Sequence, residues 1–429
     1  MTAVSEAQVT ALDSGIRVVT EAVPSVRSVA LGFWVRTGSR DEQPAQAGVS
    51  HFLEHLLFKG TERYSAIEIA ETFDGLGAAV NAATGKESTQ LHARFLDTHT
   101  EEAFQLLSEM LLGPTFPEID SEREVVLEEI AMYEDEPSDK VHDVLDEAIF
   151  GSHPLGRRVL GRAEVISSIP VPDIGAYHRA RYTARNLVVA AAGNLEHERI
   201  VELARGHLEP PEVGAADEAA TPPEVDRASV AFQRKETEQY HVCLGGPGID
   251  RRDERRFALA ILDATFGGST SSRLFREVRE KRGLAYAVGS YTQQFVDGGL
   301  VGLYVGTRED NVEEACRVIA DELASLHTDG ISDEELVRAK EHVKGRMVLS
   351  SESTGARMSR IGKSVLFDMP LLSLDEMLAR VDAVDSEQVA ALAREFYAPD
   401  SLSAAAIASD EDRFRAALAP VSESLAAAA

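Results

Sequence analysis

Residues 48–61 read GVSHFLEHLLFKGT, and this stretch organises the interpretation of the whole chain. Its apolar residues recur with helical spacing: Val49, Phe52, Leu53, Leu56 and Leu57. This pattern predicts a helix over 47–59. His51 and His55 are four residues apart, so they share one face of that helix. Two imidazoles one turn apart can bind the same Zn²⁺, and Glu54 beside them is a candidate general base.

The spelling H-x-x-E-H is a zinc-peptidase signature of the inverted type. An amphipathic core helix that happens to carry two histidines is the alternative interpretation. A third ligand and a second catalytic region elsewhere in the chain would favour the zinc interpretation.

A long helix is expected after Pro117, in the sequence EIDSEREVVLEEIAMYEDE. Glu122 and Glu129 are seven residues apart in it, which is two turns, and therefore lie on one face. Glu129 is a candidate third ligand, although an ordinary solvated position on the helix also explains an acid there.

The composition bounds the class of protein. The chain has 429 residues, 44% hydrophobic and 27% charged, which is enough for two globular domains. The net charge of −29 argues against nucleic-acid binding. No membrane span and no secretory signal is recognisable, and the two cysteines, Cys243 and Cys316, are expected to be buried thiols. These features predict a cytoplasmic protein.

Strands and hairpins mixed with helices indicate an α+β fold rather than a doubly wound sheet. The expected organisation is a first domain at 1–208, a linker at 209–226 (EPPEVGAADEAATPPEVD), a second domain at 227–420 and a flexible tail at 421–429.

The second half repeats the first at a shift near 212 residues. Arg40-Asp41-Glu42 returns as Arg252-Asp253-Glu254, and Glu122 and Glu129 map onto Glu334 and Glu341. The chain is therefore expected to hold two copies of one α/β sandwich.

The same shift takes positions 51, 54 and 55 to Asp263, Phe266 and Gly267. The second copy lacks the metal motif, so the fold itself does not need the histidines.

With these residues in view, the chain resembles the pitrilysin or M16 zinc-peptidase family, and is most similar to short bacterial members related to mitochondrial processing peptidase. The resemblance runs from the expected hairpin at 7–23 to about residue 410. It implies His51, His55 and Glu129 as zinc ligands, Glu54 as base and Glu122 as accessory acid. The gap of 74 residues from His55 to Glu129 is slightly short for the family, so Glu128 and Glu134 are alternative ligands.

The segment NAATGKEST at 81–89 resembles the family's edge strand beside the metal, which implies that Asn81, Ala82, Ala83 and Thr84 bind substrate. A tyrosine is common in the family at positions 83 and 91, where this chain has Ala83 and Leu91.

The segment REKRGLAY matches the family's Arg and Tyr pair, here Arg279 and Tyr286. Larger members have four domains in one chain and form a closed clamshell. With two domains this chain is expected to be half of one and to pair as a homodimer, with Arg279 and Tyr286 supplied in trans.

The predicted function is a zinc-dependent endopeptidase that hydrolyses unfolded peptides or small polypeptides. The alternative is a non-catalytic or partner-dependent scaffold or peptide-binding subunit of a heterodimer. Family relatives of that kind have lost the zinc motif, which this chain keeps.

Overall fold

The computed structural model describes residues 7–117, 119–208, 221–223, 228–398 and 401–427. The chain forms two compact units. Unit 1 comprises Met1–Ala131, Arg157–Ala219 and Val348–Ser373; unit 2 comprises Met132–Gly156, Ala220–Met347 and Leu374–Ala429. Most of the expected linker at 209–226 lies outside the described residues.

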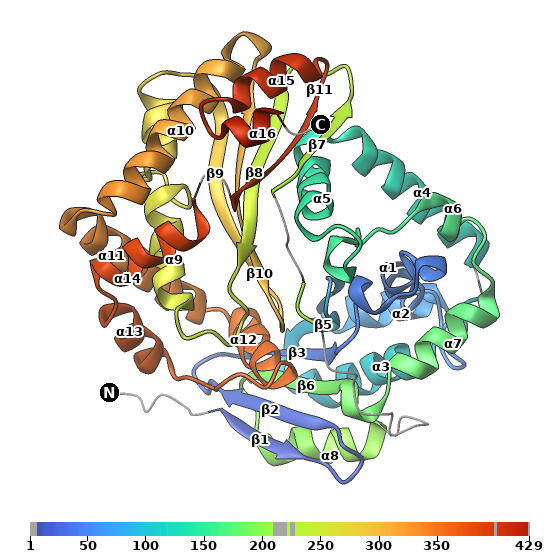
Figure 1. The fold of residues 1–429 in the computed structure, drawn as a ribbon. Coiled ribbons are helices and arrows are strands. Elements are labelled where there is room, and N and C mark those ends of the chain that lie inside the picture. Colours follow the sequence, from blue (N-terminus) through green and yellow to red (C-terminus); the bar gives the residue numbers. More distant parts are fainter. Residues whose placement is uncertain (1–6, 118, 209–220, 224–227, 399–400, 428–429) are drawn as a thin grey trace. The chain divides into compact units, whose positions relative to one another are not determined.

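Unit 1 is built on a six-stranded sheet (Figure 1). In spatial order its strands are β1 (Gln8–Ala11), β2 (Arg17–Ala22), β6 (Leu187–Gly193), β3 (Ser28–Val35), β5 (Thr89–Leu96) and β4 (Ala79–Thr84). β2 and β6 run parallel, and the other neighbours are antiparallel. The edge strand β4 is the one that carries residues 81–84.

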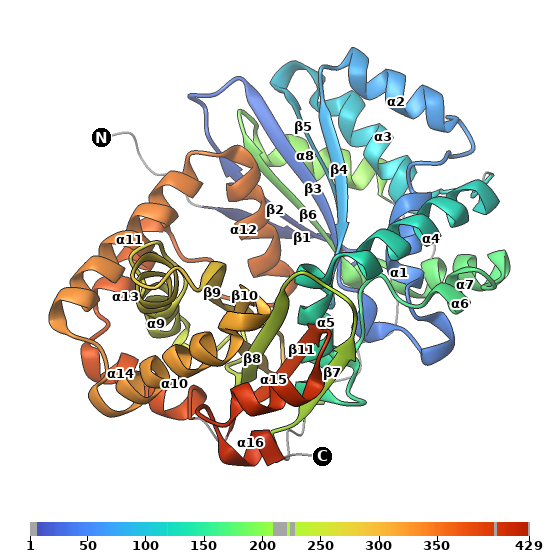
Figure 2. The same cartoon turned by 90° about the horizontal axis from the view of Figure 1, so that it is seen from above.

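The helices of unit 1 cover both faces of this sheet (Figure 2). They are α1 (Val49–Leu56), α2 (Ala66–Gly75), α3 (Thr100–Leu112), α4 (Ile119–Asp135, which ends in unit 2), α6 (Ala163–Ile166), α7 (Val171–Arg181), α8 (His197–His207) and α12 (Thr354–Leu366). Leu31 and Phe33 of β3 face the main core, whereas Gly32 lies against Met358 of α12. Burial on both faces explains why β3 is apolar throughout instead of alternating.

Unit 2 contains a five-stranded sheet. Its strands, in order, are β7 (Val230–Arg234), β11 (Ser403–Ala408), β8 (Tyr240–Gly248), β10 (Gly299–Thr307) and β9 (Ala285–Gln294). Its helices are α5 (Pro137–Phe150), α9 (Arg256–Phe266), a π-helical turn (Phe275–Glu280), α10 (Val312–Asp329), α11 (Asp333–Ser351, which ends in unit 1), α13 (Leu374–Asp382), α14 (Ser386–Phe396), α15 (Glu411–Leu418) and α16 (Glu423–Ala427).

The strand orders confirm the repeat. The order β2-β6-β3-β5-β4 in unit 1 returns as β7-β11-β8-β10-β9 in unit 2, with the same connectivity, and only β1 has no counterpart among the described strands. The expected α+β fold with two homologous domains is therefore confirmed.

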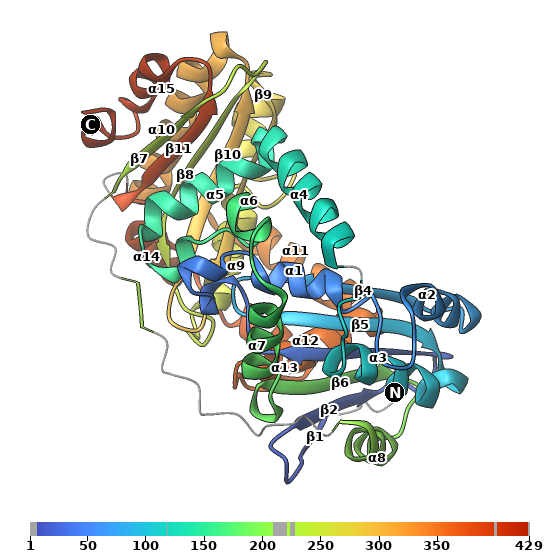
Figure 3. The same ribbon diagram turned by 90° about the vertical axis from the view of Figure 1, so that its right-hand side faces the viewer.

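Each half of the sequence gives one helix to the sheet of the other half. α5 packs on β8 and β11 in unit 2 (Figure 3), and α12 packs on β6, β3 and β2 in unit 1. The two helices occupy equivalent places in the repeat. The described units thus follow the two halves of the chain except for this exchange.

The C-terminal residues differ from the expected flexible tail. Glu423–Ala427 form α16, in which Leu425 is buried. Val421, in the turn that precedes α16, is buried as well, so the C-terminal segment packs against unit 2 through apolar side chains. Within the described residues, no helix has the length and apolar character needed to span a bilayer.

Replacing Gly362 by alanine should lower the stability of unit 1. A Cβ at this position of α12 would lie 2.5 Å from Nε1 of the fully buried Trp34 ring. Overpacking of this kind costs about 1–3 kcal/mol. Differential scanning calorimetry should show a lower unfolding temperature for Gly362→Ala. The matched control is Gly345→Ala in α11, whose Cβ meets nothing within 4 Å and which should not lower it. Equal behaviour of the two variants would contradict this packing.

Candidate metal centre

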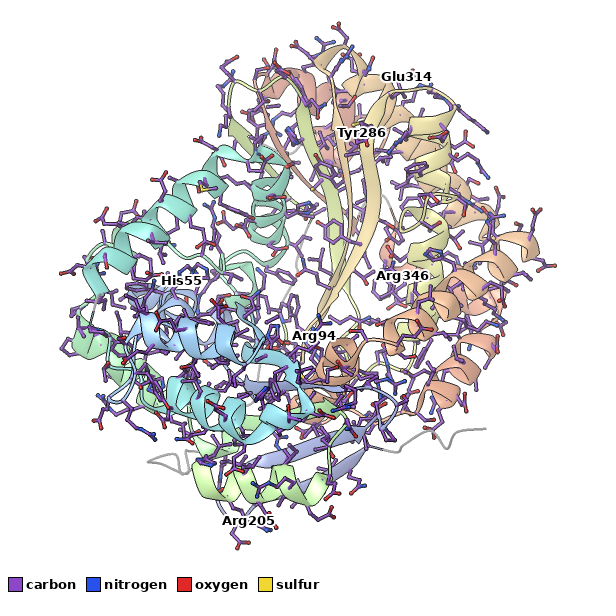
Figure 4. The ribbon with its side chains drawn as sticks, turned by 180° about the vertical axis from the view of Figure 1, so that it is seen from behind. His55, Arg94, Arg205, Tyr286, Glu314 and Arg346 are labelled. Atoms are coloured by element: carbon purple, nitrogen blue, oxygen red, sulfur yellow. The ribbon has the colours of Figure 1, made fainter. Side chains whose placement is uncertain are left out.

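Helix α1 places two imidazoles at the surface of the core of unit 1. Val49, Phe52, Leu53 and Leu56 are fully buried in that core. The opposite face of the helix carries His51, which is 7% exposed, and the half-buried His55, labelled in Figure 4.

The N-terminus of α1 is capped by a side chain from outside the helix. Glu42 is 1% exposed, and its two carboxylate oxygens accept the N–H groups of Gly48 (2.7 Å) and Ser50 (2.8 Å). The hydroxyl of buried Tyr177 lies 2.7 Å from Ser50 Oγ. Burial raises the pKa of Glu42 to about 7, although the hydrogen bonds from Gly48 and Ser50 act in the opposite direction. These contacts fix the turn that precedes His51.

Three candidate ligand atoms converge beside α1. His51 Nε2 and His55 Nε2 are 3.3 Å apart, and Glu129 Oε2 from α4 is 3.6 Å from the first and 3.2 Å from the second. Tetrahedral Zn²⁺ with bonds of about 2.0–2.1 Å holds its ligand atoms about 3.3 Å apart. The three atoms therefore fit three corners of such a site. Among the described residues, no other group of three or more His, Cys, Asp or Glu side chains has this arrangement.

The protonation states suit a metal. The imidazoles of His51 and His55 hold the pKa of Glu129 below its usual value, against the effect of partial burial. His55 Nδ1 lies 2.9 Å from Glu122 Oε1. A carboxylate there accepts a hydrogen bond from Nδ1–H, which leaves the lone pair of Nε2 directed at the site. The other oxygen of Glu122 is 2.6 Å from Lys59 Nζ.

Glu54 lies in α1 beside His55 and is not part of the three-ligand group. Burial raises the pKa of the Tyr182 phenol, and the nearby charges of Tyr177 and Glu54 add to this effect. A half-buried carboxylate one residue from a ligand is free to act as a proton acceptor.

The predicted substrate residues lie on the edge of the same sheet. Asn81, Ala82, Ala83 and Thr84 belong to β4, which pairs with β5 on one side and ends the described sheet on the other. Helix α1 packs against β4. The strand edge and the ligand-bearing helix are therefore neighbours within unit 1.

The remaining predicted residues lie elsewhere. Arg279 and Tyr286 belong to unit 2, where the guanidinium lies 4.2 Å from the centre of the Tyr286 ring and donates to the Tyr286 carbonyl at 3.0 Å. Tyr286 is 77% exposed. Of the alternative ligands, Glu128 is exposed and Glu134 pairs with Lys140. Neither belongs to the three-ligand group.

At the equivalent place in unit 2, no metal group is found among the described residues. Asp263, which replaces the first histidine, accepts a hydrogen bond from Ser290 Oγ at 2.6 Å. Burial raises its pKa to about 6.

Sequence reasoning missed Glu42 and Lys59. Glu42 precedes its two partners by six and eight residues, which is no standard capping spacing, so the sequence gives no signal for it. Lys59 follows His55 by four residues, so on a continuous helix the two side chains would share one face. This spacing is a sequence signal that places Lys59 near the candidate site.

Both halves of the chain match models of a known protein family. Residues 17–163 match the model of the insulinase family (peptidase family M16), and residues 168–343 match the model described as the peptidase M16 inactive domain. An uncharacterised zinc protease of Streptomyces coelicolor is 45% identical over 397 residues, covering 90% of this chain and 86% of that protein. The uncharacterised zinc protease YmxG of Bacillus subtilis is 42% identical over 389 residues, covering 90% and 95%.

Two solved structures share the fold. A peptidase M16 inactive domain from Pseudomonas fluorescens superposes with a TM-score of 0.89 at 24% identity, covering 94% of this chain and 98% of that one. A protease from Helicobacter pylori gives 0.87 at 21% identity, covering 94% and 100%.

The cap on α1 predicts a pH dependence of stability. Because the pKa of Glu42 is raised on folding from 4.5 to about 7, its contribution to stability is complete below pH 4.5 and is lost as the pH rises through 7. The loss amounts to about 3 kcal/mol at most. Thermal unfolding of the metal-free protein should therefore show a larger decrease from pH 5 to pH 8 in the wild type than in Glu42→Gln. Glu68→Gln, at the exposed capping box of α2, is the matched control and should keep the wild-type decrease. An identical decrease in Glu42→Gln and wild type would contradict the prediction.

Proposed function

The chain belongs to the insulinase family of peptidases, family M16, and on this premise we propose that it is a zinc-dependent endopeptidase acting on unfolded peptides or small polypeptides. The observation that carries the proposal is the convergence of His51 Nε2, His55 Nε2 and Glu129 Oε2 at tetrahedral separations. Three protein ligands leave a fourth position for water or substrate, as catalytic zinc sites require.

Zinc bound by these residues would polarise the scissile carbonyl and lower the pKa of a water molecule. Glu54 takes a proton from the attacking water and returns it to the leaving amine. Glu122 holds the Nδ1–H tautomer of His55, so that this ligand keeps its orientation during the reaction.

The substrate is proposed to add to the sheet of unit 1 as an extra strand. β4 ends that sheet, so its outer backbone groups are available to an extended peptide. Backbone pairing with residues 81–84 requires an unfolded segment and is insensitive to most side chains. This supports selection of unfolded peptides rather than of one sequence.

Arg279 and Tyr286 are proposed to bind the peptide backbone or the oxyanion from a second subunit of a homodimer. The Tyr286 ring of this pair is exposed and Arg279 is half-buried beneath it, which suits contact of the ring with a ligand. A cytoplasmic location is supported by two buried free thiols, Cys243 and Cys316, which suit a reducing compartment.

Glu54→Gln should bind zinc and fail to cleave. The amide cannot accept the proton, which should lower the rate by about 10²–10⁴-fold, while the ligands are untouched. Metal analysis should give about one zinc per chain, and a quenched fluorescent peptide measures cleavage. His51→Ala should lose both zinc and activity, and the exposed His342→Ala in α11 should keep both. Normal cleavage by Glu54→Gln would refute the mechanism, and a wild type with zinc but no activity alone would favour the partner-dependent subunit.

Mixing two inactive variants tests the homodimer. Glu54→Gln and Arg279→Ala each lack one part of the site, but a mixed dimer has one complete site if Arg279 acts in trans. Random exchange makes half of the dimers mixed, so roughly a quarter of wild-type activity should return. If each variant is first cross-linked as its own homodimer, the subunits cannot exchange, and the mixture should stay inactive. No recovery in freely exchanging subunits would show that Arg279 does not act in trans.

A further inference from the structure

Lys59 is a charged group at the candidate centre to which neither the family motifs nor the mechanism above gives a role. We propose that Lys59 is a positioning residue for the metal centre, which acts through Glu122 to hold His55 in place. The inference rests on the proposed zinc site and concerns only how this chain builds it.

The contacts form one continuous chain. Lys59 Nζ lies 2.6 Å from Glu122 Oε2, and the other oxygen of Glu122 lies 2.9 Å from His55 Nδ1. Because each oxygen has its own partner, the bond to Lys59 fixes the rotation of the carboxylate. Its second oxygen is thereby directed at His55.

This pair also joins the two helices that hold the ligands. Lys59 follows the end of α1, where its N–H donates to Leu56 O at 3.1 Å, and Glu122 is one of the first residues of α4. His55 lies on the first of these helices and Glu129 on the second. The ion pair therefore restrains the separation on which the third ligand depends.

Burial distinguishes this pair from an ordinary surface ion pair. The Glu122 side chain is only 6% exposed, while that of Lys59 is 30% exposed. Surface pairs contribute little, but a buried carboxylate without a partner is unfavourable. Among the described residues, Lys59 and His55 are the only basic side chains that pair with Glu122.

The charges at the centre lead to the same conclusion. A divalent ion beside the carboxylates of Glu54, Glu122 and Glu129 leaves one negative charge in excess. Lys59 cancels it without taking a coordination position, because its ammonium group contacts Glu122 and not the ligand atoms.

Unit 2 provides an internal comparison. The shift of 212 residues takes Lys59 to Ser271 and Glu122 to Glu334. The Glu334 side chain is 91% exposed and forms an ion pair with Arg338 at 3.7 Å on its own helix. Where the histidines are missing, the buried acid and its lysine are missing too, so the fold does not require them.

The test is a double-mutant cycle on zinc affinity. The variants are Lys59→Met, Lys59→Arg, Glu122→Gln and the double variant Lys59→Met/Glu122→Gln. Zinc affinity is measured by competition with a chromophoric chelator at one pH, and zinc release by the rate of transfer to excess chelator. Lys59→Met should bind zinc about tenfold more weakly, at the lower end of the range for groups that orient a ligand, and Lys59→Arg should stay within about threefold of the wild type. In the Glu122→Gln background, Lys59→Met should add less than about twofold.

Arg63→Met is the matched control, because Arg63 pairs with Glu109 at 2.6 Å in the same segment and does not touch Glu122. It should leave zinc affinity unchanged. Unfolding temperatures of the metal-free variants separate loss of structure from loss of the site. Lys59→Gln replaces Lys59→Met if that variant does not fold, and should weaken zinc binding similarly.

Wild-type zinc affinity in Lys59→Met or Lys59→Gln would overturn the inference, as would the same tenfold loss in both backgrounds. A wild type that binds no zinc would overturn the proposed function as well. Wild-type zinc binding with an unaffected Lys59 variant would overturn the role of Lys59 alone.

Discussion

The separation between α1 and α4 is the constraint on which the candidate centre depends. The first two candidate ligands are fixed by their spacing on one helix, but the third lies on another helix, 74 residues after His55 in the chain. Val126 and Ile130 anchor α4 in the core that also contains Phe52 of α1. Arg123 of α4 lies 5.4 Å from the centre of the Phe52 ring and donates to Ile169 O at 3.0 Å. Apolar packing and polar contacts thus restrain the same pair of helices, and with them the position of the third candidate ligand.

The repeat shows that the fold itself does not require the residues of the candidate metal centre. Unit 2 reproduces the strand order and the long helix, and yet holds an aspartate where unit 1 has its first histidine. One copy has kept a polar face that can carry chemistry. The other uses the same positions for ordinary hydrogen bonds, such as that between Asp263 and Ser290. The candidate site is therefore a property of a few side chains placed on a scaffold that also forms without them.

Local patterns were enough to predict the helix with the two histidines, the long acidic helix and the repeat. Each of these depends on the spacing of residue types along the chain. α1 is shorter than the predicted 47–59, since Gly48 takes a left-handed conformation at its start and Leu57 ends it. The cap by Glu42 was not predictable, because its partners come six and eight residues later across an irregular segment. The exchange of α5 and α12 was not predictable either. Periodicity shows which face of a helix is apolar, but it does not show against which sheet that face will pack. The contact between Lys59 and Glu122 joins segments that meet only in the folded chain.

The exchange of α5 and α12 has a consequence for synthesis. Every part of unit 1 up to Ala219 leaves the ribosome before Val348–Ser373, the segment that covers the second face of its sheet. At synthesis rates of about 5–20 residues per second the delay is on the order of ten seconds. During that interval β3 exposes an apolar face that the finished protein buries under α12. The half of the chain that carries the histidines therefore emerges first, but it is completed only after most of the other half has been made.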